Sequence, residues 1–277
     1  ADCFVNKARQ QARDAQVVVV NHHLFLSAAC VKEASDNRML PDADIVIFDE
    51  AHKLPEIGSH FFGQELSSSA VFDQLQEVRR ITISRHRHAL DKNLTWEELY
   101  ESARDALQDF VLKLDELGIH EGESQNVASV KDIQSAVPLL AQARQALDTL
   151  NAHLEPLSQD DDDLNVSYSM LSESADLMRR WEKAFEAPQA LVRDESGKPC
   201  VRWISRAGRD VRLCQTPLSF AQDFASLMAQ SPNTAWVFTS ATLATGKSDF
   251  SHFLNELGLN EVFSQAWESP FDFSNQA

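Results

Sequence analysis

The sequence predicts an α/β protein: a partial parallel sheet with a large, mainly helical insertion and a few short strands. Two observations lead to this prediction. Short apolar runs with the composition of buried strands lie near both ends of the chain, and long amphipathic helical patterns fill the interval between them. A chain of 277 residues, 43% of them hydrophobic, is long enough for one large or two medium-sized cores. We expect three segments, at residues 1–59, 60–195 and 196–277.

The first segment alternates between helix and strand. Residues 7–16 are rich in Ala, Arg and Gln, which are good helix formers, and the valines at 17–20 predict a buried strand. A helical stretch at 24–33 and a loop around Pro41 precede the apolar run at 45–48. This order of strand, helix and strand is typical of a parallel sheet.

The middle segment carries about four amphipathic helices. In the clearest one, apolar residues recur at steps of three and four between 99 and 117; Thr95 and Glu98 form a potential capping box, and Gly118 is a potential C-cap. Similar patterns occupy 137–150 and 171–185. Short β segments follow at 190–193, 200–205 and 211–214, with turns at 196–197 and 207–208, and the apolar run at 235–238 predicts another strand of the sheet.

Charge and cysteine content exclude several classes of protein. The chain has 25 Lys and Arg against 42 Asp and Glu, and the excess acid lies in residues 53–200, with 27 acidic and 15 basic groups. The run at 160–163 lacks the spaced ligands and central Gly of a calcium loop, so a solvated loop is expected. No apolar run approaches the length of a membrane span, and neither a secretion signal nor a membrane partner is expected. Four well-separated cysteines disfavour a disulfide framework and favour a reducing, cytoplasmic location.

The strongest chemical signal is the motif DEAH at residues 49–52, directly after the apolar run at 45–48. Ligands of parallel sheets bind at the carboxyl ends of the strands, where this motif is expected. Phosphoryl transfer to water needs one carboxylate to hold Mg²⁺ and another group to orient or deprotonate the water. Asp49 and Glu50 are candidates for these two roles, whereas an ordinary acidic loop is the simpler alternative.

A second motif, TSATL at residues 239–243, follows the apolar run at 235–238. Taken alone, it is equally consistent with a Ser/Thr turn before a helix near 249–257. Its position after a strand, downstream of DEAH, favours a functional interpretation.

The two strand-motif pairs resemble motifs II and III of superfamily 2 helicases. The long helical interval between them resembles the Arch domain of XPD/DinG-like iron-sulfur helicases, and the DinG/YoaA branch is the most similar. Other stretches agree with that family: Cys3 and residues 17–26 at the start, QTPL at 215–218, and ESPFDF at 268–273. The resemblance assigns 1–59 to part of a first RecA-like motor domain, 60–195 to the Arch-like insertion, and 196–277 to the return to that motor and the start of a linker to the second motor.

The resemblance implies an ATP-dependent 5′-to-3′ DNA helicase that uses Mg²⁺ and carries a 4Fe–4S cluster. Single-stranded or forked DNA, and a replication or repair protein, would be its partners in a nucleoid-associated location. Asp49 would hold Mg²⁺ through water, Glu50 would activate the hydrolytic water, and His52 would relay the nucleotide state toward Ser240 and Thr242. Cys3 would be the last cluster ligand.

The sequence departs from the family pattern in two respects. Gly246-Lys247-Ser248 is preceded by Ala241 where a phosphate-binding loop needs Gly, and it follows TSATL rather than preceding DEAH. Cys3 lacks the three upstream partners that a four-cysteine cluster requires. We therefore expect an internal part of a longer helicase that does not hydrolyse ATP alone. Two alternatives are a non-catalytic interaction module built on the acidic helices, and a helicase-like nuclease.

Two basic clusters are candidates for a DNA path. Phosphate contacts and aromatic stacking would suit single-stranded DNA, whereas a solvated helix face and a charged hairpin edge are the simpler explanations. The candidates are Arg79 and Arg80 in the first cluster and Arg202, Trp203, Arg206, Arg209 and Arg212 in the second.

Overall fold

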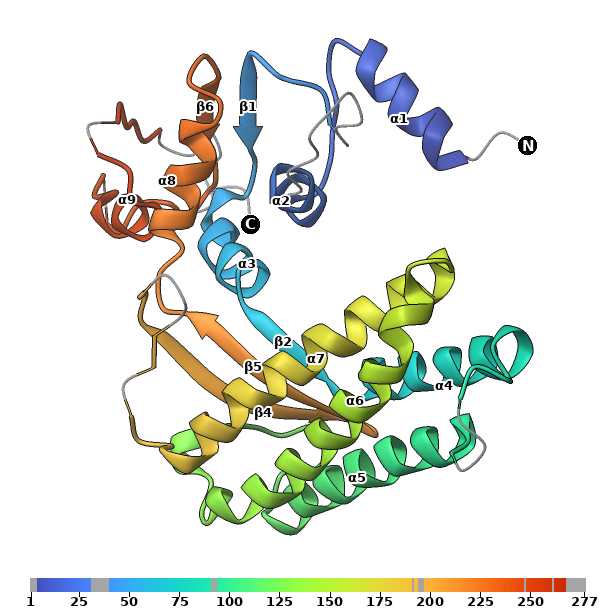
Figure 1. Cartoon of the computed structure of the whole chain (residues 1–277). Helices are drawn as coiled ribbons and strands as arrows, with labels where there is room; N and C mark the ends of the chain where they lie inside the picture. The colour runs from blue at the N-terminus through green and yellow to red at the C-terminus, as the bar shows by residue number, and fades with distance from the viewer. Residues whose placement is uncertain are drawn as a thin grey trace, which may run out of the picture. The chain divides into compact units, whose positions relative to one another are not determined.

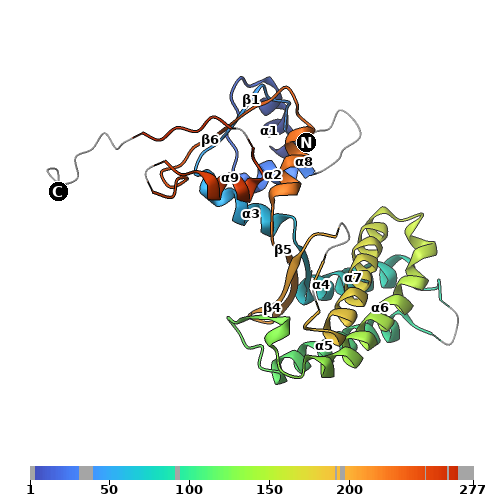
Figure 2. The ribbon, with the colours of Figure 1, turned by 90° about the vertical axis from the view of Figure 1, so that its left-hand side faces the viewer.

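The computed structural model describes residues 4–30, 40–90, 94–190, 192–193, 197–246, 248–260 and 262–267. Cys3, Lys247 and the ESPFDF stretch lie outside the described residues. The chain divides into two compact units, one formed by Ala1–Gly63 with Pro217–Ala277 and the other by Gln64–Thr216. Figures 1 and 2 show the first unit in the blue and red ends of the colour range and the second in the colours between them.

The first unit is an α/β unit around two parallel strands. Strand β1 (Ile45–Phe48) pairs with β6 (Ala235–Phe238) in a register that joins Ile45 to Ala235 and Phe48 to Phe238, which confirms both predicted strands and their parallel arrangement. The helices of this unit are α1 (Phe4–Asp14), α2 (His22–Cys30), α3 (Leu54–Phe61), α8 (Ala221–Ala229) and α9 (Ser251–Leu257).

Aromatic side chains form a large part of the core of the first unit. Phe48 lies parallel to Phe238, with 5.6 Å between ring centroids, and Phe224 of α8 meets both rings edge-on. Gly58 of α3 lies against the ring of Phe220: a Cβ at this position would be 2.6 Å from that ring. The close approach explains why a residue without a side chain occupies this buried position of α3.

The predicted strand at residues 17–20 is wrong. These residues form no strand, and Val17 and Val19 are 79% and 91% exposed. Val side chains favour extended backbone, but a strand also needs a hydrogen-bonding neighbour, and none of the described residues pairs with this segment. The same sheet leaves Ile45 and Ile47 exposed within the described part of the chain, since only alternate residues of β1 face the aromatic core.

The second unit is a layer of helices on a four-stranded sheet. Its four long helices, α4 (Ser68–Arg85), α5 (Trp96–Glu116), α6 (Val137–Ser158) and α7 (Asp162–Glu186), confirm the helical interval, and the capping box of Thr95 and Glu98 is present. The sheet order is β2-β5-β4-β3. The strands are β2 (Gln64–Ser67), β3 (Ser124–Asn126), β4 (Cys200–Ala207) and β5 (Asp210–Pro217).

The hairpin of β4 and β5 belongs to the helical unit. β5 pairs antiparallel with β2, which directly precedes α4, and β3 pairs with β4. The compact unit therefore continues to Thr216, whereas the sequence prediction ended the insertion at residue 195. Sequence patterns of single strands do not reveal this pairing, because β2 and β5 are far apart along the chain.

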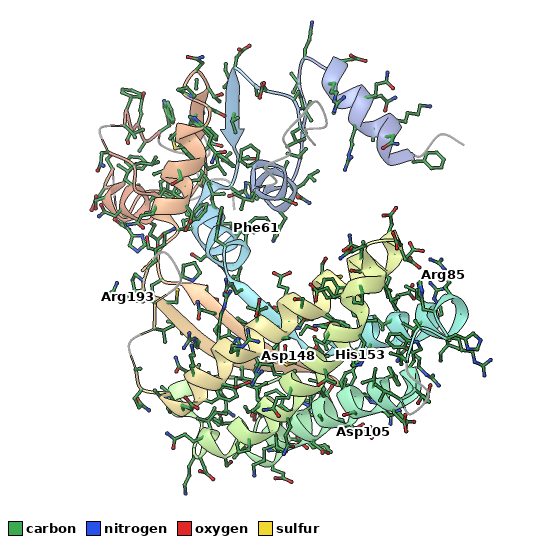
Figure 3. The ribbon with its side chains drawn as sticks, in the orientation of Figure 1. Phe61, Arg85, Asp105, Asp148, His153 and Arg193 are labelled. Carbon is green, nitrogen blue, oxygen red and sulfur yellow. The ribbon has the colours of Figure 1, made fainter. Side chains whose placement is uncertain are left out.

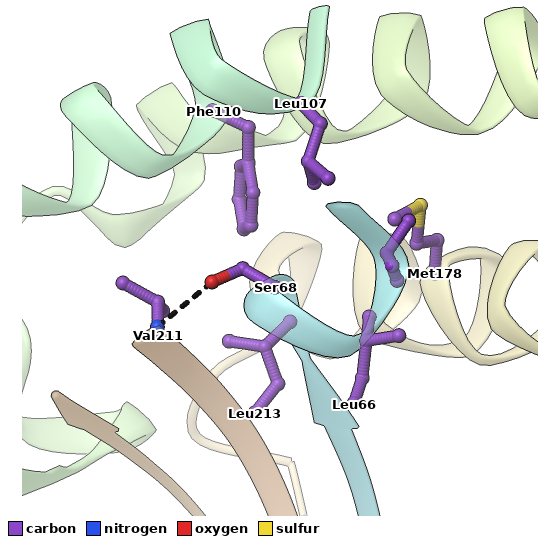
Figure 4. Close-up of a pocket in the computed structure, with 8 residues that line it drawn as sticks. Leu66, Ser68, Leu107, Phe110, Met178, Val211 and Leu213 are labelled. Atoms are coloured by element: carbon purple, nitrogen blue, oxygen red, sulfur yellow. Dashed lines mark hydrogen bonds between the residues drawn. The ribbon is translucent and has the colours of Figure 1, made fainter. Parts of the chain in front are cut away.

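The interior of this unit is well filled. A cavity of about 10 Å³ lies between α4, α5, α7 and the sheet. It is lined by apolar side chains and Ser68 (Figure 4). The Ser68 hydroxyl already accepts a hydrogen bond from the Val211 N–H at 2.9 Å. A space of this size with one satisfied polar group is a packing defect rather than a ligand site.

An ion-pair cluster joins the end of α4 to the start of α7. Asp161 caps α7 through the Leu164 N–H and accepts hydrogen bonds from Arg85, labelled in Figure 3, and from His86, both at 3.0 Å. The bond from His86, followed by those from Arg85 and the Leu164 N–H, lowers the pKa of Asp161 to about 2. The acidic run at 160–163 is thus a helix cap as well as an exposed segment.

Within the described residues, no helix combines the length and apolar character that a membrane span needs.

Phe185→Ala should lower the free energy of unfolding by about 3–5 kcal/mol. The Phe185 side chain is fully buried and packs against Phe110 and Trp181, so its loss leaves a cavity. Urea unfolding of the whole chain measures the effect. Val166→Ala is the control, since Val166 lies in the same helix but is 62% exposed, and a change within about 0.5 kcal/mol is expected. Equal losses in both variants would contradict the described core.

Asp161→Asn should destabilise the chain at pH 7, and the difference from wild type should shrink as the pH falls from about 4 to about 2. A carboxylate whose pKa is lowered by folding contributes stability above its unfolded pKa, and this contribution is lost as it becomes protonated. Thermal unfolding at a series of pH values measures it. Asp160→Asn removes a neighbouring exposed carboxylate and should have a smaller effect; a pH-independent Asp161→Asn difference would contradict the prediction.

Candidate active site

The parallel pairing of β1 with β6 places the two sequence motifs at the same edge of the sheet. DEAH follows Phe48 and TSATL follows Phe238, and these two residues are register partners. The loops are joined directly, since the Thr239 N–H donates to the Phe48 carbonyl at 2.9 Å and the Ala51 N–H donates to the Thr239 carbonyl at 3.0 Å. The two motifs therefore lie together at one edge of the sheet.

Three side chains of this site form a chain of polar contacts. The Ser240 hydroxyl donates to Glu50 Oε2 at 3.2 Å, and His52 Nδ1 lies 2.8 Å from Ser240 Oγ and 3.3 Å from Glu50 Oε2. Because the Ser240 hydrogen is used toward Glu50, a hydrogen on His52 Nδ1 completes the chain. Glu50 is thus linked to His52 both directly and through Ser240.

The other predicted residues extend this network. The Thr242 N–H donates to Ser240 Oγ at 3.2 Å, and the Thr242 hydroxyl lies 3.4 Å from the same oxygen. Asp49 Oδ1 accepts the Glu50 N–H at 3.0 Å and the Thr239 hydroxyl at 3.1 Å. The structure therefore brings all five predicted site residues together: Asp49, Glu50, His52, Ser240 and Thr242. Thr239 was not among them; its position directly after an apolar strand was the available signal.

Glu50 has a backbone conformation that is unusual for a residue with a side chain. Its φ of 49° and ψ of 41° lie in the left-handed region, and the chain turns here from β1 into the short helix η1 (Ala51–Lys53). Such a conformation costs of order 1–3 kcal/mol, and similar strain clusters at functional sites. Here the turn allows Ala51 to be buried while Asp49, Glu50 and His52 stay exposed.

The donor set suits a hard cation shared with a ligand. Mg²⁺ prefers oxygen ligands and usually keeps several waters, with one or two carboxylates and phosphate oxygens completing its shell. Asp49 is an exposed carboxylate at the ligand-binding edge of the sheet and fits this pattern. Across the part of the chain that the structure describes, no group of three or more His, Cys, Asp or Glu side chains is arranged to hold a metal by itself.

The cysteines with described side chains have a packing role. Cys200 and Cys214 are buried free thiols, and burial, with the nearby Glu65 carboxylate, raises the pKa of Cys214 to about 12. A protonated buried thiol is a poor ligand and nucleophile. Cys3 lies outside the described residues.

The first basic cluster lies on the helices of the second unit. Arg79 donates two hydrogen bonds to Glu97 of α5, and Arg80 donates two to Glu77 one turn earlier. The guanidinium of Arg79 also lies over the ring of Tyr100. Arg79 thus pairs with the neighbouring helix α5, and Arg80 pairs within its own helix α4.

The second basic cluster lies on the β4–β5 hairpin, and most of its members have partners. Arg206 pairs with Asp115, and Arg212 donates to Asp210 at 2.7 Å. Burial lowers the pKa of Arg202, which donates to Gln215, and Trp203 donates its indole N–H to Thr216. Arg209 differs: it is exposed in the turn between the strands and has no ion pair with any described residue.

Comparison with known proteins adds independent information. The DEAD_2 family model matches residues 2–71, which include DEAH. The ATP-dependent DNA helicase YoaA of Escherichia coli K12 is 39% identical over 100% of this chain, and YoaA of Haemophilus influenzae is 31% identical over 100%. The ATP-dependent DNA helicase DinG of Photobacterium profundum is 24% identical over 99%.

The chain spans about two fifths of the length of these relatives, at 40% of each YoaA sequence and 42% of DinG. The similarity covers both units, since it extends over the whole chain. The DEAD_2 match and the similarity over the whole chain support a relationship to part of the DinG/YoaA-like helicases.

Proposed function

We propose that the chain forms the distal part of the first motor domain and the Arch-like insertion of an ATP-dependent 5′-to-3′ DNA helicase. The whole protein would couple Mg-ATP hydrolysis to movement along single-stranded DNA during repair or replication stress. The observation that carries the proposal is the hydrogen-bonded network between DEAH and TSATL at the end of β1 and β6. The names of the relatives, which are ATP-dependent DNA helicases, support it.

In this proposal each side chain of the network has one task. Bound Mg²⁺ would neutralise charge on the nucleotide phosphates. Asp49 would hold its water shell, and Glu50 would accept a proton from the attacking water as general base. His52 and Ser240 contact Glu50, so a change at Glu50 would reach Thr242 through Ser240. This path would connect nucleotide state to the loop that follows β6.

The remaining parts of the proposed enzyme would come from a longer protein. The sequence has no phosphate-binding loop ahead of DEAH, and Gly246-Lys247-Ser248 lacks the required first glycine. We propose that the chain alone does not hydrolyse ATP, and that Cys3 is the last ligand of a 4Fe–4S cluster whose other cysteines precede it.

The DNA path is proposed to pass the β4–β5 turn. Among the candidate arginines, Arg209 is exposed and has no ion pair with a described residue, so its charge is available to a phosphate. Arg206 shares its charge with Asp115, and its side chain is only 17% exposed. Single-stranded or forked DNA would contact Arg209, while Arg206 would hold the hairpin against α5.

Glu50→Gln in the full-length helicase should lower single-strand-stimulated ATP hydrolysis by about 10²–10⁴-fold, with nucleotide binding retained, because the amide keeps the shape but cannot accept the proton. Steady-state hydrolysis and nucleotide affinity measure the two effects. Glu56→Gln is the matched control, since Glu56 is an exposed carboxylate in the first turn of the nearby helix α3. Normal turnover in Glu50→Gln would remove Glu50 as the base. No hydrolysis by wild type would favour the interaction-module alternative.

Arg209→Gln should weaken single-stranded DNA binding and reduce the slope of log affinity against log salt by about 1, as the loss of one phosphate contact requires. Fluorescence anisotropy with a labelled oligonucleotide at several salt concentrations measures both. Arg209→Lys keeps the charge and should keep the slope. An unchanged slope in Arg209→Gln would take this turn off the DNA path.

A further inference from the structure

Thr239 is hydrogen-bonded to the end of β1 and to the DEAH loop that follows it. Its N–H donates to the Phe48 carbonyl and its carbonyl accepts from the Ala51 N–H. Its hydroxyl lies 3.1 Å from Asp49 Oδ1 and 3.4 Å from the Phe48 carbonyl oxygen, and the shorter contact to the charged acceptor is the stronger hydrogen bond. The two backbone bonds would form with any residue other than proline at this position. Only the hydroxyl contacts depend on the residue being a threonine or serine, and the shorter of the two reaches the Asp49 carboxylate.

This contact makes the two oxygens of Asp49 unequal. Oδ1 accepts both the Thr239 hydroxyl and the Glu50 N–H, whereas Oδ2 has no hydrogen bond to a described residue. The carboxylate torsion of Asp is soft, so an unrestrained carboxylate would exchange its two oxygens. Two donors on Oδ1 hold the group in one orientation and leave Oδ2 toward solvent.

We propose that Thr239 is a positioning residue for Mg²⁺: its hydroxyl fixes Asp49 Oδ1 so that Oδ2 receives a water of the Mg-nucleotide. This inference rests on the proposed function, because it requires a nucleotide site completed by the rest of the helicase. Groups that orient a metal-binding carboxylate typically change metal affinity about 10–100-fold when removed. The exposed position of Thr239 favours the lower end of that range.

A second threonine, at the other end of β6, provides a matched control. Thr234 lies just before the strand, and its hydroxyl donates to the Ala43 carbonyl at 2.8 Å, at the opposite end of the β1–β6 pair. Both hydroxyls therefore join the same two chain segments, but only Thr239 reaches a carboxylate. If the hydroxyls serve only to hold the strands together, removing either should have the same effect.

The experiment measures binding of a fluorescent, non-hydrolysable ATP analogue to the full-length helicase at a series of Mg²⁺ concentrations. Mg²⁺ should increase the affinity for the analogue, and in Thr239→Val the Mg²⁺ concentration that gives half of this increase should rise about tenfold. The affinity for the analogue in EDTA should stay unchanged. Thr239→Ser restores the hydroxyl and should restore the wild-type midpoint. Thr234→Val should also keep it. If Thr239→Val does not fold, Thr239→Ala takes its place.

Two outcomes would overturn the proposal: an unchanged Mg²⁺ midpoint in Thr239→Val, or the same shift in Thr239→Val and Thr234→Val. Failure of the proposed function has a different signature. Wild-type protein that shows no Mg²⁺-dependent nucleotide binding at all would refute the nucleotide site itself, and the role of Thr239 with it.

Discussion

The parallel pairing of β1 with β6 is the interaction on which the candidate site depends. Neither DEAH nor TSATL alone supplies all the side chains of the hydrogen-bonded network. Their loops meet because Phe48 and Phe238 are register partners. A shift of one residue would turn the alternate side chains of β6 to the other face of the sheet and separate Thr239 from Asp49. The stacked rings of Phe48 and Phe238 oppose such a shift by fixing the two strand ends beside each other.

The sequence predicted the parts of the molecule that local patterns specify. Helices α4 to α7 follow from apolar periodicity and caps, and the site residues follow from two short motifs after apolar strands. Parallel pairing was inferred because strands joined through helices generally run parallel, and the structure confirms it. These features share one property: each depends on neighbours in sequence or on a general rule of topology.

The features that the sequence did not reveal depend on distant partners. The valines at 17–20 have strand composition, but no described strand lies beside them. The sequence alone does not show whether the basic side chains of β4 and β5 are free to bind DNA or are already paired. Arg206, for example, pairs with Asp115, which lies far away along the chain. The contact of Thr239 with Asp49 was likewise invisible, since a hydroxyl residue after a strand is common and its orientation depends on the facing loop.

The pairing of Gln64 with Gln215 also has a consequence for how such a protein can change in evolution. The chain leaves the first unit and returns to it through adjacent antiparallel strands, so the two ends of the insertion lie one strand spacing apart. A short hairpin turn could close the same gap without moving either end. The first unit would therefore tolerate the gain, loss or replacement of the whole helical unit, as surface loops tolerate insertions, while β1 and β6 keep their register.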